Sequence, residues 1–534
     1  MRTSLFVGLF LLIGTTSAQS PYQKLLDSDE GAGRAITMHN NGELTLVANH
    51  ALQGTGPGMQ VVRYATDGTQ QWSTIVRLNT GMGLPLANDV AATADGGAVI
   101  LGEHVMGPPQ DSAFVVKVDA AGTIVWAKRF SLNDPNVLSC RMERAAVSPT
   151  GEIYLLGQAT VLNGGVGQDM IITKMDPNGV VLWSKRMTTA FNNTITRPTH
   201  LTLTQSGNIS VSGQVTQNYE GVFTVEMNDQ GNILYKGLFN PYSFEFTVTY
   251  RALTVGGDAN WFLTRNLDSN TDQLLEFDTD PQGNVIDALT YDIGGLNGSI
   301  RRVVPQGQSY LAVGDFEVAP GDRDAVAVHL PANGSPTGMA YGTSGNEQVV
   351  DASINSMFGA AIAGMAILDS FLNKRGNAAQ VTYLINTDSL LHSADCENPI
   401  TITTDTTTVT QDTITFFPTD ITGWADATFV QDTGYVEIEV CNPSAGLAQP
   451  QAAAFHLFPN PTSGLVTLRL GDPADRLLAL HLYNNLGQQV LTRGHAPVAH
   501  GADLVLDLTR FHPGIYHLRI STSAGTRTQR LVIQ

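Results

Sequence analysis

The chain has 534 residues and carries 29 Lys or Arg against 48 Asp or Glu, a formal net charge of −19. This balance, with basic residues that look few and unclustered, argues against nucleic acid and anionic lipid as partners. It suits divalent cations, cationic partners or simply solubility.

The first 18 residues are typical of a secretory signal peptide. Met1-Arg2 supplies a positive start, Leu5–Ile13 a short apolar run, and Ala18 ends a small-residue site before Gln19. The run is too short to span a membrane, and we find no other apolar stretch of about 18 residues. We therefore expect a signal peptide at 1–18 and no transmembrane segment in the mature chain.

The region that follows is repetitive. Val61–Trp72, Val115–Trp126 and Ile172–Trp183 each contain a strand, a Gly-containing turn and a second strand with Trp four residues past the Gly. Each turn follows an upstream strand motif, which ends in Gly in copies such as Leu101-Gly102 and Leu156-Gly157. The turn glycines, which are Gly68, Gly122, Gly179, Gly231, Gly283 and Gly334, are 54, 57, 52, 52 and 51 residues apart.

Seven copies of a four-stranded unit of this length predict a seven-bladed β-propeller over residues 19–395. We expect the Trp residues to pack between neighbouring blades. The Gly at the end of Leu101-Gly102 should occupy a crowded place near the axis. Tyr22-Gln-Lys24 resembles the start of the strand at Trp126, so the mature N-terminus should supply the outer strand of the seventh blade and close the ring.

The repeats are similar to the bacterial β-propeller repeats of secreted multi-domain proteins, which implies a fold and no function. After them, Cys396 and Cys441 bracket a Thr-rich stretch. We predict a small Thr-rich β module at 396–442 and a Cys396–Cys441 disulfide, with two free thiols as the alternative. Cys140 should then be buried and inert. The composition of residues 443–454 predicts a linker, where cleavage would fall.

Residues 455–534 alternate as short strands and predict a small β-sandwich. They resemble the type A (Por-type) C-terminal sorting domain of the type IX secretion system. This resemblance implies that the type IX secretion machinery is a partner and that the protein is secreted or located at the outer cell surface. An ordinary C-terminal β domain is the alternative. The motif residues that carry the resemblance are Pro459, Asn460, Pro461, Gly464, Tyr483, Asn484, Gly487, Gly514 and Tyr516.

The chain has none of the short catalytic or phosphate-binding motifs, and we predict no cofactor. Asp268, Asn270 and Asp272 alternate like calcium ligands but lack the Gly and the distal Glu of an EF-hand, so a solvated loop is the competing interpretation.

The function is thus predicted only by class. The leading hypothesis is a non-enzymatic binding or adhesion module that holds an extracellular glycan, peptide or protein. The rival is a secreted glycosidase or lyase with paired carboxylates at the propeller mouth; a structural part of the cell envelope is a third possibility.

Overall fold

The structure is a computed structural model that describes residues 21–441 and 455–534 with short gaps. The gaps are 27–30, 51–56, 80–82, 108–110, 163–164, 190–193, 205, 217–219, 241–245, 254–258, 267–271, 281–283, 295, 308, 320, 333, 343–345, 356, 373–377, 394–396, 407–408, 413, 434–436, 471–476, 485–488, 495–503 and 523–524. The described part divides into two compact units, 1–443 and 444–534.

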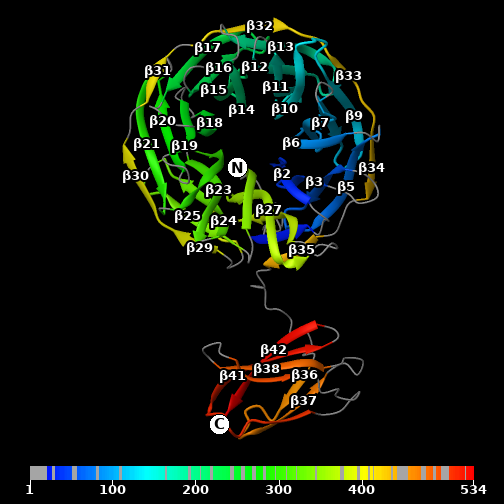
Figure 1. The fold of residues 1–534 in the computed structure, drawn as a ribbon, viewed down its shortest axis with the longest axis vertical. Coiled ribbons are helices and arrows are strands. Elements are labelled where there is room, and N and C mark those ends of the chain that lie inside the picture. Colours follow the sequence, from blue (N-terminus) through cyan, green and yellow to red (C-terminus); the bar gives the residue numbers. More distant parts are fainter. Residues whose placement is uncertain are drawn as a thin grey trace, which may run out of the picture. The chain divides into compact units, whose positions relative to one another are not determined.

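The first unit is a β-propeller whose described strands form seven antiparallel blades of four (Figure 1). Blades 1 to 3 are β2(Gly31–Met38), β3(Leu44–His50), β4(Gly58–Tyr64), β5(Gln70–Leu78); β6(Leu84–Ala92), β7(Ala98–Val105), β8(Ser112–Val118), β9(Ile124–Phe130); and β10(Val137–Val147), β11(Ile153–Leu162), β12(Val166–Met175), β13(Val181–Thr189). Blades 4 to 6 are β14(Ile195–Leu203), β15(Ile209–Thr216), β16(Glu220–Met227), β17(Ile233–Asn240); β18(Phe246–Leu253), β19(Ala259–Asn266), β20(Asp272–Thr279), β21(Val285–Ile293); and β22(Asn297–Gln306), β23(Ser309–Ala319), β24(Asp322–Leu330), β25(Thr337–Tyr341).

Blade 7 joins the two ends of the propeller sequence. It consists of β26(Asn346–Ile354), β27(Ala360–Leu372), β28(Ala378–Asn386) and, as its fourth strand, the N-terminal β1(Tyr22–Leu26). Tyr22 pairs with Asn386 and Leu26 with Thr382. This confirms that the N-terminus closes the ring, which removes an open sheet edge between the first and last blades.

The conserved shape of the repeated turn follows from its Asp and its Gly. In the Asp119–Thr123 turn, one carboxylate oxygen of Asp119 accepts the N–H groups of Ala121 at 2.9 Å and Thr123 at 2.8 Å. Gly122 takes a φ of +82°, which a side chain would strain. Asp and Gly at this spacing therefore fix a tight connection between the third and fourth strands.

Each repeated Trp packs on the turn of the next blade, as predicted. A Cβ on Gly122 would lie 2.8 Å from the ring of Trp72, so the missing side chain makes room for the indole. Tyr22 occupies the same place over Gly68 at the closure of the ring. The indole N–H groups of Trp72, Trp126 and Trp183 donate to the carbonyl oxygens of Ala120, Pro177 and Asp229 at 2.9, 3.1 and 3.0 Å.

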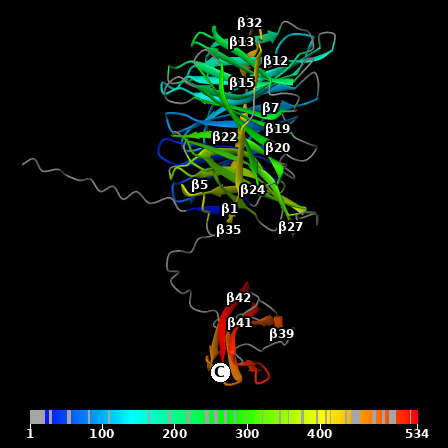
Figure 2. The same cartoon turned by 90° about the vertical axis from the view of Figure 1, so that its left-hand side faces the viewer.

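The expected separate β module at 396–442 is wrong. Its strands form a belt, residues 397–441, which runs around the outside of the ring and adds a fifth antiparallel strand to every blade (Figures 1 and 2). The belt visits blades 6, 5, 4, 3, 2, 1 and 7 in that order. Its strands are β29(Glu397–Ile400), β30(Ile402–Thr406), β31(Thr410–Asp412), β32(Phe416–Asp420), β33(Trp424–Asp426), β34(Phe429–Thr433) and β35(Glu437–Cys441).

The belt covers polar strand edges and also contributes to the core. Phe416 is buried, with its ring centroid 5.4 Å from that of Phe223 in blade 4. Phe429 is likewise buried, 5.5 Å from the ring centroid of Phe114 in blade 2. Each short strand carries few apolar residues and cannot form a core of its own, so pairing with a blade is the stable arrangement.

The second unit is the predicted β-sandwich. One sheet orders β36(Phe455–Phe458), β37(Leu465–Leu470) and β40(Leu504–Asp507), and the other orders β39(Gln489–Gly494), β38(Leu477–Asn484), β41(Gly514–Thr522) and β42(Gly525–Ile533). Val466 and Leu468 are buried while Leu465 is exposed, so the alternation in the sequence sets the inner face.

Two motif residues of the sandwich make defined side-chain hydrogen bonds to its backbone. The side-chain amide of Asn460 donates to the Arg530 carbonyl at 2.8 Å and accepts the Val532 N–H at 2.9 Å. Tyr516 is buried and donates its hydroxyl hydrogen to the His512 carbonyl at 2.9 Å. The Asn460 side chain thus pairs with the backbone of β42 as a neighbouring strand would.

Candidate functional site

The inner strands of the propeller carry a bulge at the same level in six blades. The register slips by one residue between Ala87 and Asp89, between Met142 and Arg144, and at equivalent places in β2, β14, β22 and β26. A bulge re-aims the side chains around it. The bulged residues of the six strands are Arg34, Asn88, Glu143, Thr199, Arg301 and Val350.

Glycine on the second strand makes this bulge possible. A Cβ on Gly102 would collide with the carbonyl oxygen of Leu86 on the inner strand, and one on Gly157 with that of Arg141. Gly213, Gly314 and Gly364 occupy the same position in other blades. The prediction that Gly102 lies at a crowded place near the axis is confirmed. The close approach of the two strands at these glycines allows the bulges that shape the wall of the channel.

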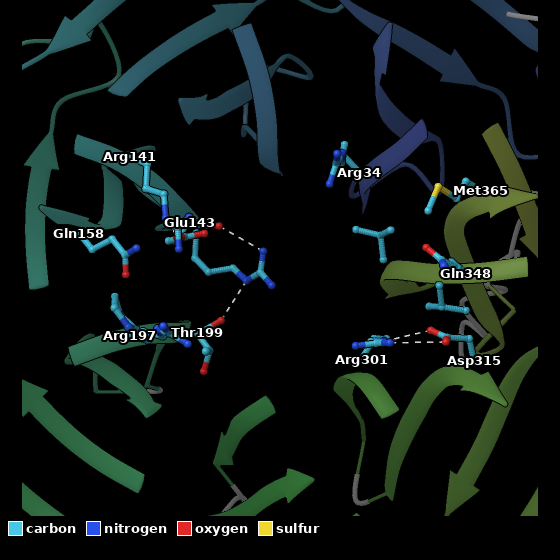
Figure 3. Close-up of a pocket in the computed structure, with 14 residues that line it drawn as sticks. Arg34, Arg141, Glu143, Gln158, Arg197, Thr199, Arg301, Asp315, Gln348 and Met365 are labelled. Carbon is cyan, nitrogen blue, oxygen red and sulfur yellow. Dashed lines mark hydrogen bonds and ion pairs between the residues drawn. The ribbon is translucent and has the colours of Figure 1, made fainter. Parts of the chain in front are cut away.

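Around the bulges lies a pocket of about 470 Å³ that opens among the inner strands (Figure 3). Its described lining contains five arginines and two acids, a net formal charge of +3 in a protein whose total is −19. The charged lining residues are Arg34, Arg141, Arg144, Arg197, Arg301, Glu143 and Asp315. The expectation that basic residues are unclustered is therefore wrong: residues distant in sequence meet because each comes from an inner strand or its neighbour.

Arg144 is fixed by the backbone on both sides of its blade. Its Nε donates to the Thr199 carbonyl at 3.0 Å, and its Nη1 donates to the carbonyls of Asn88 at 3.3 Å and Glu143 at 3.1 Å. One guanidinium thus joins blades 2, 3 and 4. The three carbonyls hold it in one geometry in the wall of the pocket.

The two acids of the pocket are both paired with arginine. Glu143 accepts from Arg141 at 2.5 Å. Asp315 is buried and accepts from Arg301 at 3.0 Å and from Arg323 at 2.5 Å. Neither carboxylate therefore stands by itself at the surface of the pocket.

Arg34 and Arg197 are the guanidinium groups with most capacity left for a ligand. Burial lowers the pKa of Arg34, and its Nε has no hydrogen-bond partner in the described part of the chain. Arg197 is exposed and donates from Nε to the Gln168 side chain at 3.2 Å. An anion beside Arg34 would supply the partner that its Nε lacks.

Buried charged residues next to the bulges link the inner strands of neighbouring blades. Asp89 and Asp351, both buried, accept the N–H groups of Ala145 at 2.8 Å and Ile36 at 3.0 Å in the next blades. Arg302 pairs with Asp351 at 3.2 Å. Burial raises the pKa of Asp89 to about 6, although Arg144 and Arg302 oppose the rise.

A second cavity of about 450 Å³ is lined by residues of the inner strands β2, β6, β10, β22 and β26. Asp89 and Arg302 line it, and much of its remaining wall is alanine and valine. It has no lining residue in common with the arginine pocket. The two cavities therefore differ in chemistry.

Most residues predicted as sites do not meet in this pocket. Asp268 and Asn270 lie outside the described residues, as does the side chain of Asp272, and among the described residues no group of His, Cys, Asp or Glu could hold a metal ion. Cys396, Gly487 and the proposed signal peptide and linker also lie outside them. Cys140 is buried, and burial raises the pKa of its thiol to about 11, which keeps it protonated and unreactive.

One signal in the sequence could have found the pocket. Charged residues recur at equivalent positions of the first strand in several repeats, as in Arg34, Glu143-Arg144 and Arg301-Arg302. A strand that is buried in a core should be apolar at these positions. Aligning the repeats by their inner strands, as well as by their turns, would have exposed this exception.

Comparisons with known proteins address the two units separately. Residues 456–534 match the secretion system C-terminal sorting domain. No curated protein matches the chain. Similar solved structures include a protein of unknown function from Dyadobacter fermentans, at 12% identity and a TM-score of 0.41, covering 58% of this chain and 99% of that one.

Two enzyme-related structures show similarly distant likeness. The GH93 α-L-arabinofuranosidase of Fusarium graminearum, solved with arabinobiose, has 10% identity and a TM-score of 0.39, covering 55% of this chain and 92% of its own. The subtype N11 neuraminidase-like protein of A/flat-faced bat/Peru/033/2010 (H18N11) has 10% identity and a TM-score of 0.36, covering 68% and 99%. Likeness at this level assigns no activity to this chain.

The protein is thus a β-propeller protein with a C-terminal sorting domain. The domain marks it for export through the type IX secretion system, to the cell surface or the extracellular space. In the part of the chain that the structure describes, no helix has the length and apolar character to cross a membrane.

Proposed function

We propose that this exported propeller is a binding protein whose arginine-lined pocket holds an anionic group of an extracellular ligand. The supporting observation is the local charge: five arginines converge in one chamber of a strongly acidic protein. Gathering like charges is costly unless something compensates them. Arg34, with an Nε that lacks a partner, is the sharpest sign that the compensating anion comes from outside.

The rival hydrolase is less well supported by the same pocket. A glycosidase needs one carboxyl group as acid and another as base or nucleophile. The two acids in the described lining, Glu143 and Asp315, are instead paired with arginines. The described lining also has no aromatic residue, so recognition would depend on charge and hydrogen bonds.

Replacing Arg34 and Arg197 by Gln should weaken anion binding by at least about 100-fold, since each charge-assisted hydrogen bond contributes about 1.5–3 kcal/mol. Isothermal titration of the exported protein with polygalacturonate, chondroitin sulfate, poly-L-glutamate and neutral dextran measures this. Lys236→Gln is the matched control, because Lys236 is an exposed cation on β17 outside the pocket.

We expect at least one anionic polymer and no dextran to bind, and Lys236→Gln to behave as the wild type. Equal affinity of the Arg34→Gln/Arg197→Gln protein would place binding elsewhere and contradict the proposal. Release of shortened products, followed by mass spectrometry, would favour the hydrolase.

Binding should tighten as the pH falls from about 7 to about 5. Asp89, whose pKa is raised to about 6, takes up a proton in this range and stops neutralising Arg144 in the wall of the pocket. The expected gain is several-fold, on the order of 1 kcal/mol. Titration with chondroitin sulfate, whose sulfate groups stay charged throughout, measures it.

Asp89→Asn separates this effect from other titrations. Asn keeps an oxygen for the Ala145 N–H but carries no charge, so the variant should bind at pH 7 nearly as tightly as the wild type does at pH 5. Burial also raises the pKa of Glu103, which interacts with Arg34 and Arg141 of the pocket, so Glu103 is a second group that could take up a proton there. An unchanged pH profile in Asp89→Asn would assign the effect to Glu103 or to the ligand.

A further inference from the structure

Blade 7 differs from the other blades in the turns that follow its first and third strands. Among the described residues, Phe358 and Leu391 are the two non-glycine residues with a left-handed backbone, at φ of +59° and +68°. Their N–H groups close the turns on the carbonyls of Asn355 and Asp388. Glycine closes the equivalent turns of other blades, at Gly42, Gly96, Gly151 and Gly207 and at Gly68, Gly122, Gly179 and Gly231. A side chain is strained in this conformation, so both exceptions need a cause.

Packing accounts for Leu391 but not for Phe358. Leu391 is buried in the core that blades 6 and 7 share, and its carbonyl accepts the Tyr341 hydroxyl at 2.6 Å. Phe358 is instead 67% exposed. An exposed ring contributes little to the fold, so burial does not compensate for the strain. Strain without such compensation is typical of functional sites.

The second turn places another apolar side chain on the same surface. Leu390 is 68% exposed. Small or polar residues take its place in other blades, which are Asp67, Ala121, Asn178 and Gln230. The side-chain amide of Asn355 donates to the Thr387 carbonyl at 2.6 Å, so the two turns lie against each other. Phe358 and Leu390 are therefore called the apolar patch of blade 7.

The surface around this patch is acidic. The turns that follow the first and third strands of the seven blades contain no Lys or Arg, and most of them contain Asp or Glu. Asp388 belongs to the same turn as Leu390 and pairs with His392 at 3.4 Å. A second copy of this chain would bring an equally acidic face to the patch, which disfavours self-association there.

Cations on the third and fourth strands do not cancel this charge beside the patch. Lys24 in blade 7 is buried and donates to the Gly68 carbonyl at 2.5 Å. The cations that pair with acids of the turns belong to blades 1 to 3, and they are Arg63, Lys117 and Lys174. The patch thus combines exposed apolar side chains with a negative surround.

We infer that the apolar patch of blade 7 is a docking site for a protein segment that presents apolar side chains flanked by Lys or Arg. The apolar side chains of the partner cover Phe358 and Leu390, and the acidic turns attract its cations. Neither residue of the patch lines the arginine pocket, so this site is separate from the proposed anion site. The exported protein can therefore hold two ligands of opposite charge at two places.

Fluorescence anisotropy with three labelled synthetic peptides tests this site. A Leu/Lys peptide is the probe, and a Ser/Lys peptide and a Leu/Glu peptide of equal length are its controls. We expect the exported wild-type protein to bind the Leu/Lys peptide at least about 10-fold more tightly than either control, since only this peptide matches both the apolar patch and its charge.

The variant Phe358→Gly/Leu390→Asn removes the patch and leaves the charge unchanged. Its affinity for the Leu/Lys peptide should fall at least about 10-fold. Its unfolding temperature should stay equal or rise, because glycine relieves the strain at this turn. Leu234→Asn is the matched control, since Leu234 is 56% exposed beside a turn of blade 4, and it should bind like the wild type.

Three results would overturn the inference. Equal binding of the Leu/Lys peptide by the double variant would place the peptide elsewhere. A clearly lower unfolding temperature of that variant would mean that the two side chains stabilise the fold. A wild-type dimer in analytical ultracentrifugation that the double variant lacks would assign the patch to a second copy. Since Arg34→Gln/Arg197→Gln should bind the Leu/Lys peptide normally, the proposed function stands or fails separately.

Discussion

A chain that ends at Ser393 should not form a stable propeller. It lacks the belt, so the outermost strand of each blade loses its partner and the cores lose Phe416 and Phe429. Removing one buried Phe costs about 3–5 kcal/mol, so the summed loss is on the order of 10 kcal/mol or more. That is comparable to the whole stability of an ordinary domain, about 5–15 kcal/mol.

Thermal unfolding followed by circular dichroism measures this effect. A chain ending at Pro443, which removes only the second unit, is the control and should unfold like the full chain. A cooperative transition of the chain ending at Ser393 within a few degrees of the control would contradict the role of the belt.

A pair of point variants tests the belt without truncation. Phe416 is 4% exposed and its neighbour Phe417 is 51% exposed on the same strand. Phe416→Ala should lower the free energy of unfolding by about 3 kcal/mol, and Phe417→Ala by less than about 0.5 kcal/mol. Equal effects would mean that the belt does not pack on the blades.

The second large effect concerns the chain just before the belt and the last strand of the belt, which both meet β1. The Ser393 hydroxyl donates to the Tyr22 carbonyl at 3.2 Å, and Cys441 pairs with Gln23 in the strand register. Cys396 is only three residues beyond Ser393, a span of at most about 11 Å. We therefore propose that Cys396 and Cys441 form a disulfide that closes the belt around the ring.

Loss of this bond should lower the free energy of unfolding by about 3–4 kcal/mol, because the closed loop contains about 45 residues. Denaturant unfolding of Cys441→Ser against the wild type measures it, and reductant should affect only the wild type. Peptide mapping without reduction should link Cys396 with Cys441 and leave Cys140 as a thiol. Three free thiols in the unfolded, unreduced protein would exclude the disulfide.

The sequence predicted those parts of the fold that local chemistry determines. The turn at Asp119–Thr123 and the Trp72 ring on Gly122 repeat with a fixed spacing, so the blades and their contacts could be predicted. The motif at Asn460 likewise predicted the sorting domain. These features lie within one or two repeats and need no knowledge of distant strands.

The belt and the pocket could not be found in the same way. Strand β32 pairs with a partner more than 200 residues earlier in the chain, and its five residues do not distinguish a blade edge from a module of its own. The arginines of the pocket come from four blades, and each looks like a surface residue until the ring brings the inner strands together. The belt and the pocket both depend on contacts between residues far apart in the sequence, and local preferences do not reveal such contacts.

The position of β1 sets the order in which the protein can fold. It lies between β28 and β35, so one of the first strands to be made has partners that are among the last. Contacts over such a sequence separation form slowly, because the intervening chain must be ordered first. The ring therefore stays open until residues up to Asn386 are present, and β1 gains its second partner only when residues up to Cys441 are present. The sorting domain begins shortly after Cys441. The last strand of the propeller and the export signal are therefore made at almost the same stage of synthesis.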